Sequence, residues 1–383
     1  MLRSSPVVVA VTVFALYAGW LSLAHYHLGH RMTDFAFIGQ QFVDRSSTSP
    51  AIEADRAHIQ SEWGYDGQFF LYIAQDPSGA PPYIDDASYR YGRIVYPMLA
   101  RGLALGRQDV IPFMLVGINV LAVAVGALAL GVVLRRHGAS PWYAMFFALY
   151  PGIFVAVLRD LSEALAYALA ACAVLLFDRG GRAALVGSCA LFAVAALTRE
   201  TTVVFALACA LLLLLRDRSV RRGLPFAVGA ILPYVLYRSV FLDRWLGHAG
   251  VPAALRPSLI PFGGIAHYWP WTGDVLDQAY ALVFPGAFCL ALAIWALLRR
   301  RDDLGLWALA GNALALVVLV PPAVFSDYYA SLRVGTGVVV AFVVAIPALM
   351  ALVPRSRTWV WLPVVFWMAP WWQLLQIIFQ SQY

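Results

Sequence analysis

Long apolar runs recur along almost the entire chain, and they constrain its fold more than any other feature. A membrane-spanning helix needs about 20 mostly apolar residues. Eleven segments match this pattern, near residues 6–25, 110–134, 141–158, 162–177, 183–198, 201–215, 224–240, 277–298, 304–322, 331–353 and 357–379. The sequence therefore predicts an all-α fold, a polytopic transmembrane helical bundle of about eleven spans that forms a single integral membrane domain over residues 1–383.

The composition excludes several other classes of protein. Hydrophobic residues make up 62% of the chain and charged residues 13%, whereas a soluble domain carries about 25% charged residues. A water-soluble enzyme, a disordered chain and a coiled coil are therefore excluded. All 27 basic residues are arginine, which indicates codon bias in the genome. We expect no nucleic-acid partner, even though the net charge is +6.

The placement of the arginines predicts the orientation in the membrane, because short cytoplasmic loops carry an excess of basic residues. With the N-terminus inside, the inside loops hold 14 of the 27 arginines and four of the 21 acidic residues. The inside then carries +10 and the outside −4. We therefore expect a cytoplasmic N-terminus.

Two long segments then fall outside, residues 26–109 and 241–276. Loops longer than about 12–15 residues are uncommon unless they are functional or disordered. The first segment has 84 residues and many aromatic side chains. We expect it to fold on the membrane surface and to carry the chemistry of the protein.

The densest stretch of this first loop centres on Asp66. Over residues 67–75 the spacing of polar and apolar side chains predicts a helix with Phe69, Phe70 and Ile73 on one face. We expect this helix to be interfacial, with its apolar face toward lipid. Asp66 comes directly before it, and two interpretations stay open: the carboxylate caps free N–H groups of the helix, or it faces a substrate.

Arginines gather on the outer side of the predicted bundle. In the first loop Arg90 and Arg93 alternate with tyrosines, a pattern that also fits an interfacial aromatic belt. Four outward helix ends carry further charges: Arg159 near Glu163, Arg199 beside Glu200, Arg238 near Asp243, and Arg333 near Asp327. Each arginine could snorkel to the surface. Four on one side predict a pocket for an anion, because the guanidinium fork suits phosphate oxygens.

Several short motifs resemble one family of membrane enzymes. The first loop contains Tyr65-Asp66-Gly67-Gln68-Phe69-Phe70, then Ile73-Ala74, then Tyr96-Pro97. This series resembles the first-loop signature of GT-C glycosyltransferases, most of all the mannosyltransferases that add the second mannose of GPI anchors and their bacterial relatives. Residues 161–164 and 197–201 resemble later helix-end motifs of that family, so the resemblance covers roughly residues 60–205.

The sequence departs from the family pattern at the proposed catalytic acid. Tyr65 stands where the family has tryptophan, and an inserted stretch precedes Asp66. Other GT-C branches place the acid directly after the first helix, where this chain has Asp34. The resemblance therefore implies that the catalytic base is either Asp66 or Asp34.

The resemblance implies an inverting transfer of a sugar, with mannose favoured, from a polyprenyl-phosphate donor to an acceptor hydroxyl. The acceptor would be a glycan, a glycolipid or a protein on the periplasmic face of the bacterial inner membrane. One carboxylate would deprotonate the hydroxyl and arginines would stabilise the departing lipid phosphate. The residues implied in binding the donor are Arg199, Arg90, Arg93 and Arg159, with Glu163 and Glu200 orienting the guanidinium groups or binding sugar hydroxyls.

Two other functions stay open, and the sequence indicates no cofactor but leaves a requirement for a divalent metal open. A lipid-linked sugar flippase or secondary transporter would place its charges near the membrane midplane. An O-antigen ligase or polymerase would carry its large outer loop late in the chain. The four cysteines lie in apolar runs without ligand spacing, and His25, His27 and His30 fit interfacial histidines better than metal ligands, so the sequence indicates no metal site.

Overall fold

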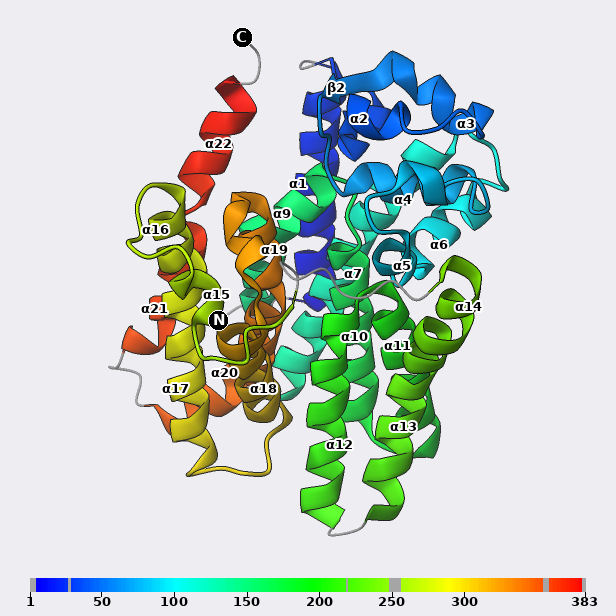
Figure 1. Cartoon of the computed structure of the whole chain (residues 1–383). Coiled ribbons are helices and arrows are strands. Elements are labelled where there is room, and N and C mark those ends of the chain that lie inside the picture. Colours follow the sequence, from blue (N-terminus) through cyan, green and yellow to red (C-terminus); the bar gives the residue numbers. More distant parts are fainter. Residues whose placement is uncertain (1–4, 27–28, 218–219, 248–255, 354–357, 381–383) are drawn as a thin grey trace.

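The computed structural model describes residues 5–26, 29–217, 220–247, 256–353 and 358–380. Within these ranges the fold is all-α apart from one two-stranded parallel sheet, in which Ile38 pairs with Ile59. Figure 1 shows the elements of the first loop gathered at one end of α10 to α13, with the end of α12 and the start of α13 at the other end. His27 lies outside the described residues.

The first loop is built from short helices and the small sheet. Its elements are η1 (Met32–Ala36), β1 (Ile38–Gly39), α2 (Gln40–Val43), α3 (Pro50–Glu53), η2 (Ala54–His58), β2 (Ile59–Ser61), α4 (Gly67–Gln75), η3 (Pro81–Tyr83), α5 (Ala87–Tyr91) and α6 (Val95–Leu103).

Apolar helices lie in all the segments that the sequence predicts as spans. The elements of the first half are α1 (Pro6–Tyr26), α7 (Ile111–Arg136), η4 (Pro141–Ala144), α8 (Met145–Ala148), α9 (Pro151–Leu158), α10 (Glu163–Arg179), α11 (Arg182–Thr198), η5 (Glu200–Thr202) and α12 (Val203–Asp217). Those of the second half are α13 (Val220–Leu236), η6 (Tyr237–Leu242), α14 (Asp243–Leu246), α15 (Gly263–Ala266), α16 (Asp274–Gln278), η8 (Ala279–Val283), α17 (Phe284–Leu297), α18 (Leu304–Leu319), η9 (Pro322–Ser326), α19 (Tyr328–Val334), α20 (Thr336–Leu352), η10 (Thr358–Trp361), α21 (Leu362–Met368) and α22 (Trp371–Gln380).

Five helical stretches of the described chain are long and apolar enough to cross a membrane, and a sixth is added if the bent pair Pro141–Ala148 and Pro151–Leu158 forms one span. The helices α10, α11, α12 and α18 have only 15 to 17 residues. At 1.5 Å per residue these are shorter than a hydrocarbon core of about 30 Å. The structure supports a multi-pass membrane protein, and the number of eleven spans stays a prediction.

The helix α4 has the predicted bounds, Gly67–Gln75, but a different environment. All its residues are buried, with Phe69 and Phe70 only 3% and 1% exposed. Phe69 contacts Phe42 edge-on, and Phe70 contacts Tyr96 in the same way. The expectation of an interfacial helix with its apolar face toward lipid is therefore wrong. Other first-loop elements and α7 cover this face, and hydrophobic periodicity by itself does not distinguish a protein neighbour from lipid.

The first loop is anchored to the bundle and shares its hydrophobic core. The Tyr96 hydroxyl donates to the carbonyl of Leu115 in α7 at 3.0 Å and accepts from the Asn119 amide at 2.8 Å. At the end of α4, Arg101 Nη1 donates to the carbonyl of Gln75 at 2.6 Å, which satisfies a backbone acceptor that the helix leaves free. Through α6, the end of α4 is thereby held in place relative to α7.

The predicted orientation gives opposite accessibility to two exposed serines. Ser47 lies in the first loop and Ser140 in the connection after α7. We expect Ser47→Cys to react with a membrane-impermeant thiol reagent in intact spheroplasts, and Ser140→Cys to react only after permeabilisation. The unmodified chain sets the background, because its four cysteines lie in apolar helices. Labelling of Ser140→Cys alone from the outside contradicts this orientation.

Candidate active site

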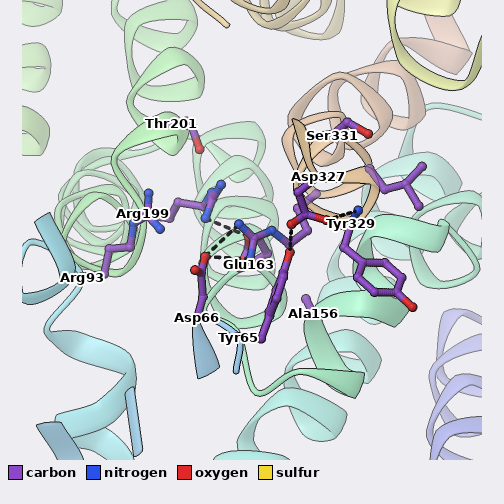
Figure 2. Close-up of polar contacts among 12 residues, drawn as sticks. Tyr65, Asp66, Arg93, Ala156, Glu163, Arg199, Thr201, Asp327, Tyr329 and Ser331 are labelled. Carbon is purple, nitrogen blue, oxygen red and sulfur yellow. Dashed lines mark hydrogen bonds and ion pairs between the residues drawn. The ribbon is translucent and has the colours of Figure 1, made fainter. Parts of the chain in front are cut away.

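The Asp66 carboxylate lies between two arginines from distant parts of the chain. Arg333 donates to Oδ2 of Asp66 from Nη1 at 2.9 Å and from Nη2 at 3.0 Å. Arg90 Nη2 lies 2.9 Å from Oδ1. The carboxylate accepts no capping hydrogen bond from the backbone of α4, so the capping interpretation is wrong. Its side chain stays 21% exposed, and Figure 2 shows it directed toward the charged groups of the bundle.

Close backbone packing positions Asp66. A Cβ atom on the next residue, Gly67, would lie 2.0 Å from the carbonyl oxygen of Arg159. Only glycine therefore lets the start of α4 approach the end of α9 this closely. At the second residue of α4, the Gln68 side chain accepts from the N–H of Gly39 at 2.9 Å, which ties the helix to β1.

Two opposing effects act on the protonation of Asp66. Burial would raise the pKa of its carboxyl, but the guanidinium groups of Arg90 and Arg333 hold this pKa well below its usual range. Opposite charges at hydrogen-bond distance favour the ionised form. Asp66 is therefore a carboxylate at neutral pH.

A chain of alternating charges leads from Asp66 into the bundle. Arg333 Nε lies 3.2 Å from Oε1 of Glu163, and the same oxygen lies 2.8 Å from Nη1 of Arg199. Glu163 is 1% exposed at its side chain, and the two arginines are 8% and 6% exposed. Charges buried to this extent cost several kcal/mol each unless they are paired. We name Asp66, Arg333, Glu163 and Arg199 the ion chain.

Two further arginines of the first loop join this region. Arg90 also forms a two-point contact with Asp85, at 2.9 Å from Nε and 2.6 Å from Nη2. Arg93 forms a similar contact with Glu200, at 3.1 and 2.8 Å. Burial would raise the pKa of Glu200, but the charge of Arg93 lowers it to about 2. Arg93 and Arg199 thus pair with the two glutamates that the sequence singles out, Glu200 and Glu163.

A cavity of about 620 Å³ opens beside the ion chain. Its polar lining holds three arginines, two acids, one asparagine and four residues with hydroxyl groups: Arg93, Arg199, Arg238, Asp86, Glu200, Asn312, Tyr89, Tyr167, Tyr234 and Thr201. Its remaining walls are mostly apolar and come from α12, α18 and α20, for example Leu207, Leu316 and Val338. With three arginines and two acids, the polar lining carries a net positive charge, and the cavity combines it with a hydrocarbon-like wall.

Arg238 differs from the other two arginines of this cavity. Arg93 and Arg199 each have a carboxylate partner. Arg238 donates to the carbonyl of Ser88, and among the residues that the structure describes no carboxylate pairs with it. The cavity thus contains one guanidinium whose charge is not neutralised by an acidic side chain.

The structure does not bring the alternative acid, Asp34, into this cluster. Asp34 lies in η1 and accepts from the backbone N–H of Arg31 at 2.7 Å, and its carboxylate is 4.0 Å from His30. These are the contacts of a residue that caps a short helix. Asp66, and not Asp34, lies among the arginines.

Arg159 lies apart from the cavity arginines. Its guanidinium carbon is 3.9 Å from the centre of the Phe37 ring and 5.8 Å from that of Tyr329. It lines none of the cavity described above. Of the four arginines expected to bind the donor, which are Arg199, Arg90, Arg93 and Arg159, only Arg93 and Arg199 line this cavity.

Sequence reasoning left Arg333 and Arg238 out of the site, although both were noted at helix ends. The feature of the sequence that could have identified Arg333 is a single arginine at the start of an apolar span, residues 331–353. Such a residue is rare in a membrane segment and marks function by default. Sequence reasoning also missed the hydrogen bond of 2.7 Å from the Tyr65 hydroxyl to Oδ2 of Asp327, which joins residues 262 positions apart.

No group of three or more histidine, cysteine or acidic side chains with the geometry of a metal site occurs in the described ranges.

No protein-family model matches the chain, and no match was found among curated proteins or solved structures. The resemblance to GT-C glycosyltransferases therefore rests on the short motifs alone, and the function that it implies stays a prediction.

Removing the buried carboxylate of the ion chain is expected to destabilise the protein strongly. Glu163→Gln removes the carboxylate partner of Arg199 and leaves Arg333 with Asp66 as its only partner in the ion chain. Breaking a buried ion pair in this way typically costs about 3–5 kcal/mol. The control is Asp109→Asn, whose ion pair with Arg107 is about two-thirds exposed and should contribute about 0–1 kcal/mol. Thermal unfolding in detergent measures both. Equal shifts in the two variants would contradict a structural role for the ion chain.

Proposed function

We propose that the protein transfers a sugar, with mannose favoured, from a polyprenyl-phosphate donor to an acceptor hydroxyl. The observation that carries this proposal is the ion chain, which links an ionised, partly exposed Asp66 to a cavity with arginines at one end and apolar walls. A carboxylate for a proton and cations for a phosphate are the groups that the reaction needs.

The cavity suits a donor that is itself a membrane lipid. Arginine binds phosphate oxygens through its planar fork, and Arg238 has no acidic partner in the described chain. We place the donor phosphate near Arg238, Arg199 and Arg93, with the first isoprenoid units against the apolar walls from α12, α18 and α20. The tyrosine hydroxyls at the same end could bind the sugar.

Asp66 would act as the general base. The acceptor oxygen attacks the anomeric carbon, the bond from that carbon to the phosphate oxygen breaks, and the lipid phosphate leaves with the electron pair. Asp66 takes the proton of the acceptor hydroxyl. Because one displacement occurs, the configuration at the anomeric carbon inverts.

The ion chain would connect donor binding to the strength of the base. In the ligand-free protein Arg90 and Arg333 hold the pKa of Asp66 low, which makes Asp66 a weak base. A lipid phosphate that pairs with Arg199 leaves Glu163 to Arg333, and Arg333 then attracts Asp66 less strongly. The pKa of Asp66 rises as a result, and proton transfer becomes more favourable.

The membrane arrangement belongs to the same proposal. Eleven spans, a cytoplasmic N-terminus and a first loop on the periplasmic side of the bacterial inner membrane would place Asp66 where an extracytoplasmic acceptor can reach it. The charges of the site lie at one end of α10 to α12 and not along them. This arrangement favours an enzyme at the membrane surface over a transporter with its site at the midplane.

Asp66→Asn tests the catalytic base. We expect turnover of radiolabelled polyprenyl-phosphate mannose, measured with membrane extract as the source of acceptor, to fall by roughly 10²–10⁴-fold, the usual contribution of a positioned base. The variant should still fold, because Arg90 keeps its contact with Asp85 and Arg333 keeps Glu163.

Asp34→Asn is the matched control. It keeps a side chain that can accept the hydrogen bond of Arg31, and we expect nearly normal turnover. A folded but inactive Asp34→Asn together with an active Asp66→Asn would assign the base to Asp34. Failure of the unmodified protein to consume the donor would refute the proposed donor.

Arg238→Gln tests the lipid-phosphate site. Loss of a hydrogen-bonded charge contact costs about 1.5–3 kcal/mol, so KM for the donor should rise about 10- to 100-fold. Arg244→Gln is the control, since Arg244 lies on the next helix, is exposed and does not line the cavity. If both variants bind the donor equally well, Arg238 does not contact the phosphate.

A further inference from the structure

A second cationic position lies outside the donor cavity and is centred on Arg159. This residue ends α9, and its guanidinium is stacked on Phe37 of the first loop and faces Tyr329 of α19. Nε of Arg159 is buried and has no hydrogen-bond partner. No acidic side chain within 4.0 Å pairs with Arg159 in the described part of the chain.

The electrostatic environment of Arg159 differs from that of the other arginines near Asp66. Burial lowers the pKa of Arg159 and outweighs the opposing effects of Tyr329, Tyr65 and Asp327. Burial acts on Arg90 in the same direction, but Asp66 and Asp85 outweigh it and raise the pKa of Arg90. A buried cation without a compensating anion costs free energy. The fold keeps Arg159 at this cost, as proteins often do where a residue serves binding and not stability.

The surroundings of Arg159 are accessible and adjoin the catalytic carboxylate. The carbonyl of Arg159 contacts Gly67, the residue after Asp66. Tyr65, Asp327 and Tyr329 are all partly exposed. Figure 2 shows Asp327 and Tyr329 on one side of the carboxylates of Asp66 and Glu163, and Arg93 on the other. Arg159 contacts Tyr329 and does not line the donor cavity.

Asp327 is the acidic group that shares this side with Arg159. Both its oxygens are engaged, Oδ2 by the Tyr65 hydroxyl at 2.7 Å and Oδ1 by the backbone N–H of Tyr329 at 2.9 Å. It forms no ion pair with Arg159, and its charge raises the pKa of Arg159 too little to outweigh burial. Phenol rings such as those of Tyr65 and Tyr329 offer flat apolar faces next to hydroxyl groups, which suits a sugar ring.

We propose that Arg159 binds an anionic group, a phosphate or a carboxylate, on the acceptor, and that the acceptor lies against Tyr65 and Tyr329 with its hydroxyl toward Asp66. The assignment of this anion to the acceptor rests on the proposed glycosyl transfer. The anion site itself does not depend on that reaction. An acceptor of this class is a phosphorylated glycolipid or a glycan that contains a sugar acid.

Anion-dependent thermal stability tests the site without the unknown acceptor. Inorganic phosphate and glucuronate are titrated separately at constant ionic strength with chloride, in the Arg238→Gln background, so that the donor cavity contributes less. We expect at least one of the two anions to raise Tm in this background. Adding Arg159→Gln should abolish the rise, and Arg159→Lys should keep a smaller one because it retains the charge without the fork.

The two probes separate phosphate from carboxylate recognition by the size of the rise. A rise that persists with Arg159→Gln, or no rise with either anion, would overturn the proposal. The Tm without anions gives an independent readout. Arg159→Gln should leave Tm unchanged or higher, because it removes a buried charge without an acidic partner. A fall in Tm as large as that of Glu163→Gln would show that Arg159 has a purely structural role and would also overturn the proposal.

The anion titration and the donor assay can fail independently of each other. If the protein consumes no polyprenyl-phosphate sugar but its anion-dependent rise in Tm requires Arg159, the anion site stands and the glycosyl transfer fails. If the donor is consumed and the rise does not require Arg159, the transfer stands and the acceptor site fails.

Discussion

The buried ion chain is the interaction on which the arrangement of this protein depends. Asp66 comes from the first loop, Glu163 and Arg199 come from the middle of the chain, and Arg333 comes from a late helix. Each charge is acceptable in a largely apolar interior only because the next one compensates it. Pairing therefore selects one relative position of the loop and the helices, where apolar packing alone would tolerate several.

The first loop contributes to this selection through its own packing. Its helix α4 is buried on all sides, and Gly67 brings the start of that helix against the backbone of Arg159. The loop is thus part of the hydrophobic core and not a layer that rests on lipid. A carboxylate held this way needs little reorganisation during a reaction, which is the condition for effective catalysis by positioned groups.

The charges around Asp66 separate into two regions with different electrostatics. In the cavity, Arg93 and Arg199 are neutralised by glutamates and Arg238 is not. On the other side, Arg159 lies on aromatic rings without an acidic partner. Two uncompensated guanidinium groups on two sides of one carboxylate suit a reaction that joins two anionic substrates. Whether an arginine has an acidic partner therefore says more about its role in binding than the number of arginines does.

The sequence by itself determined the all-α class, the membrane location and the bounds of the helix Gly67–Gln75, because these follow from the period and length of apolar runs. It also indicated that Asp66 and the outward arginines matter, since charges near apolar spans are costly. Only the tertiary structure decided that Asp66 is ion-paired and not a cap, that Asp34 lies apart, and that Arg333 and Arg238 belong to the site. Pairing depends on distances between segments up to 267 residues apart, which no local pattern encodes. The same reason explains why Arg159 was grouped with the donor arginines: the sequence shows that two charges lie at the same membrane surface, but not which side of a carboxylate they occupy.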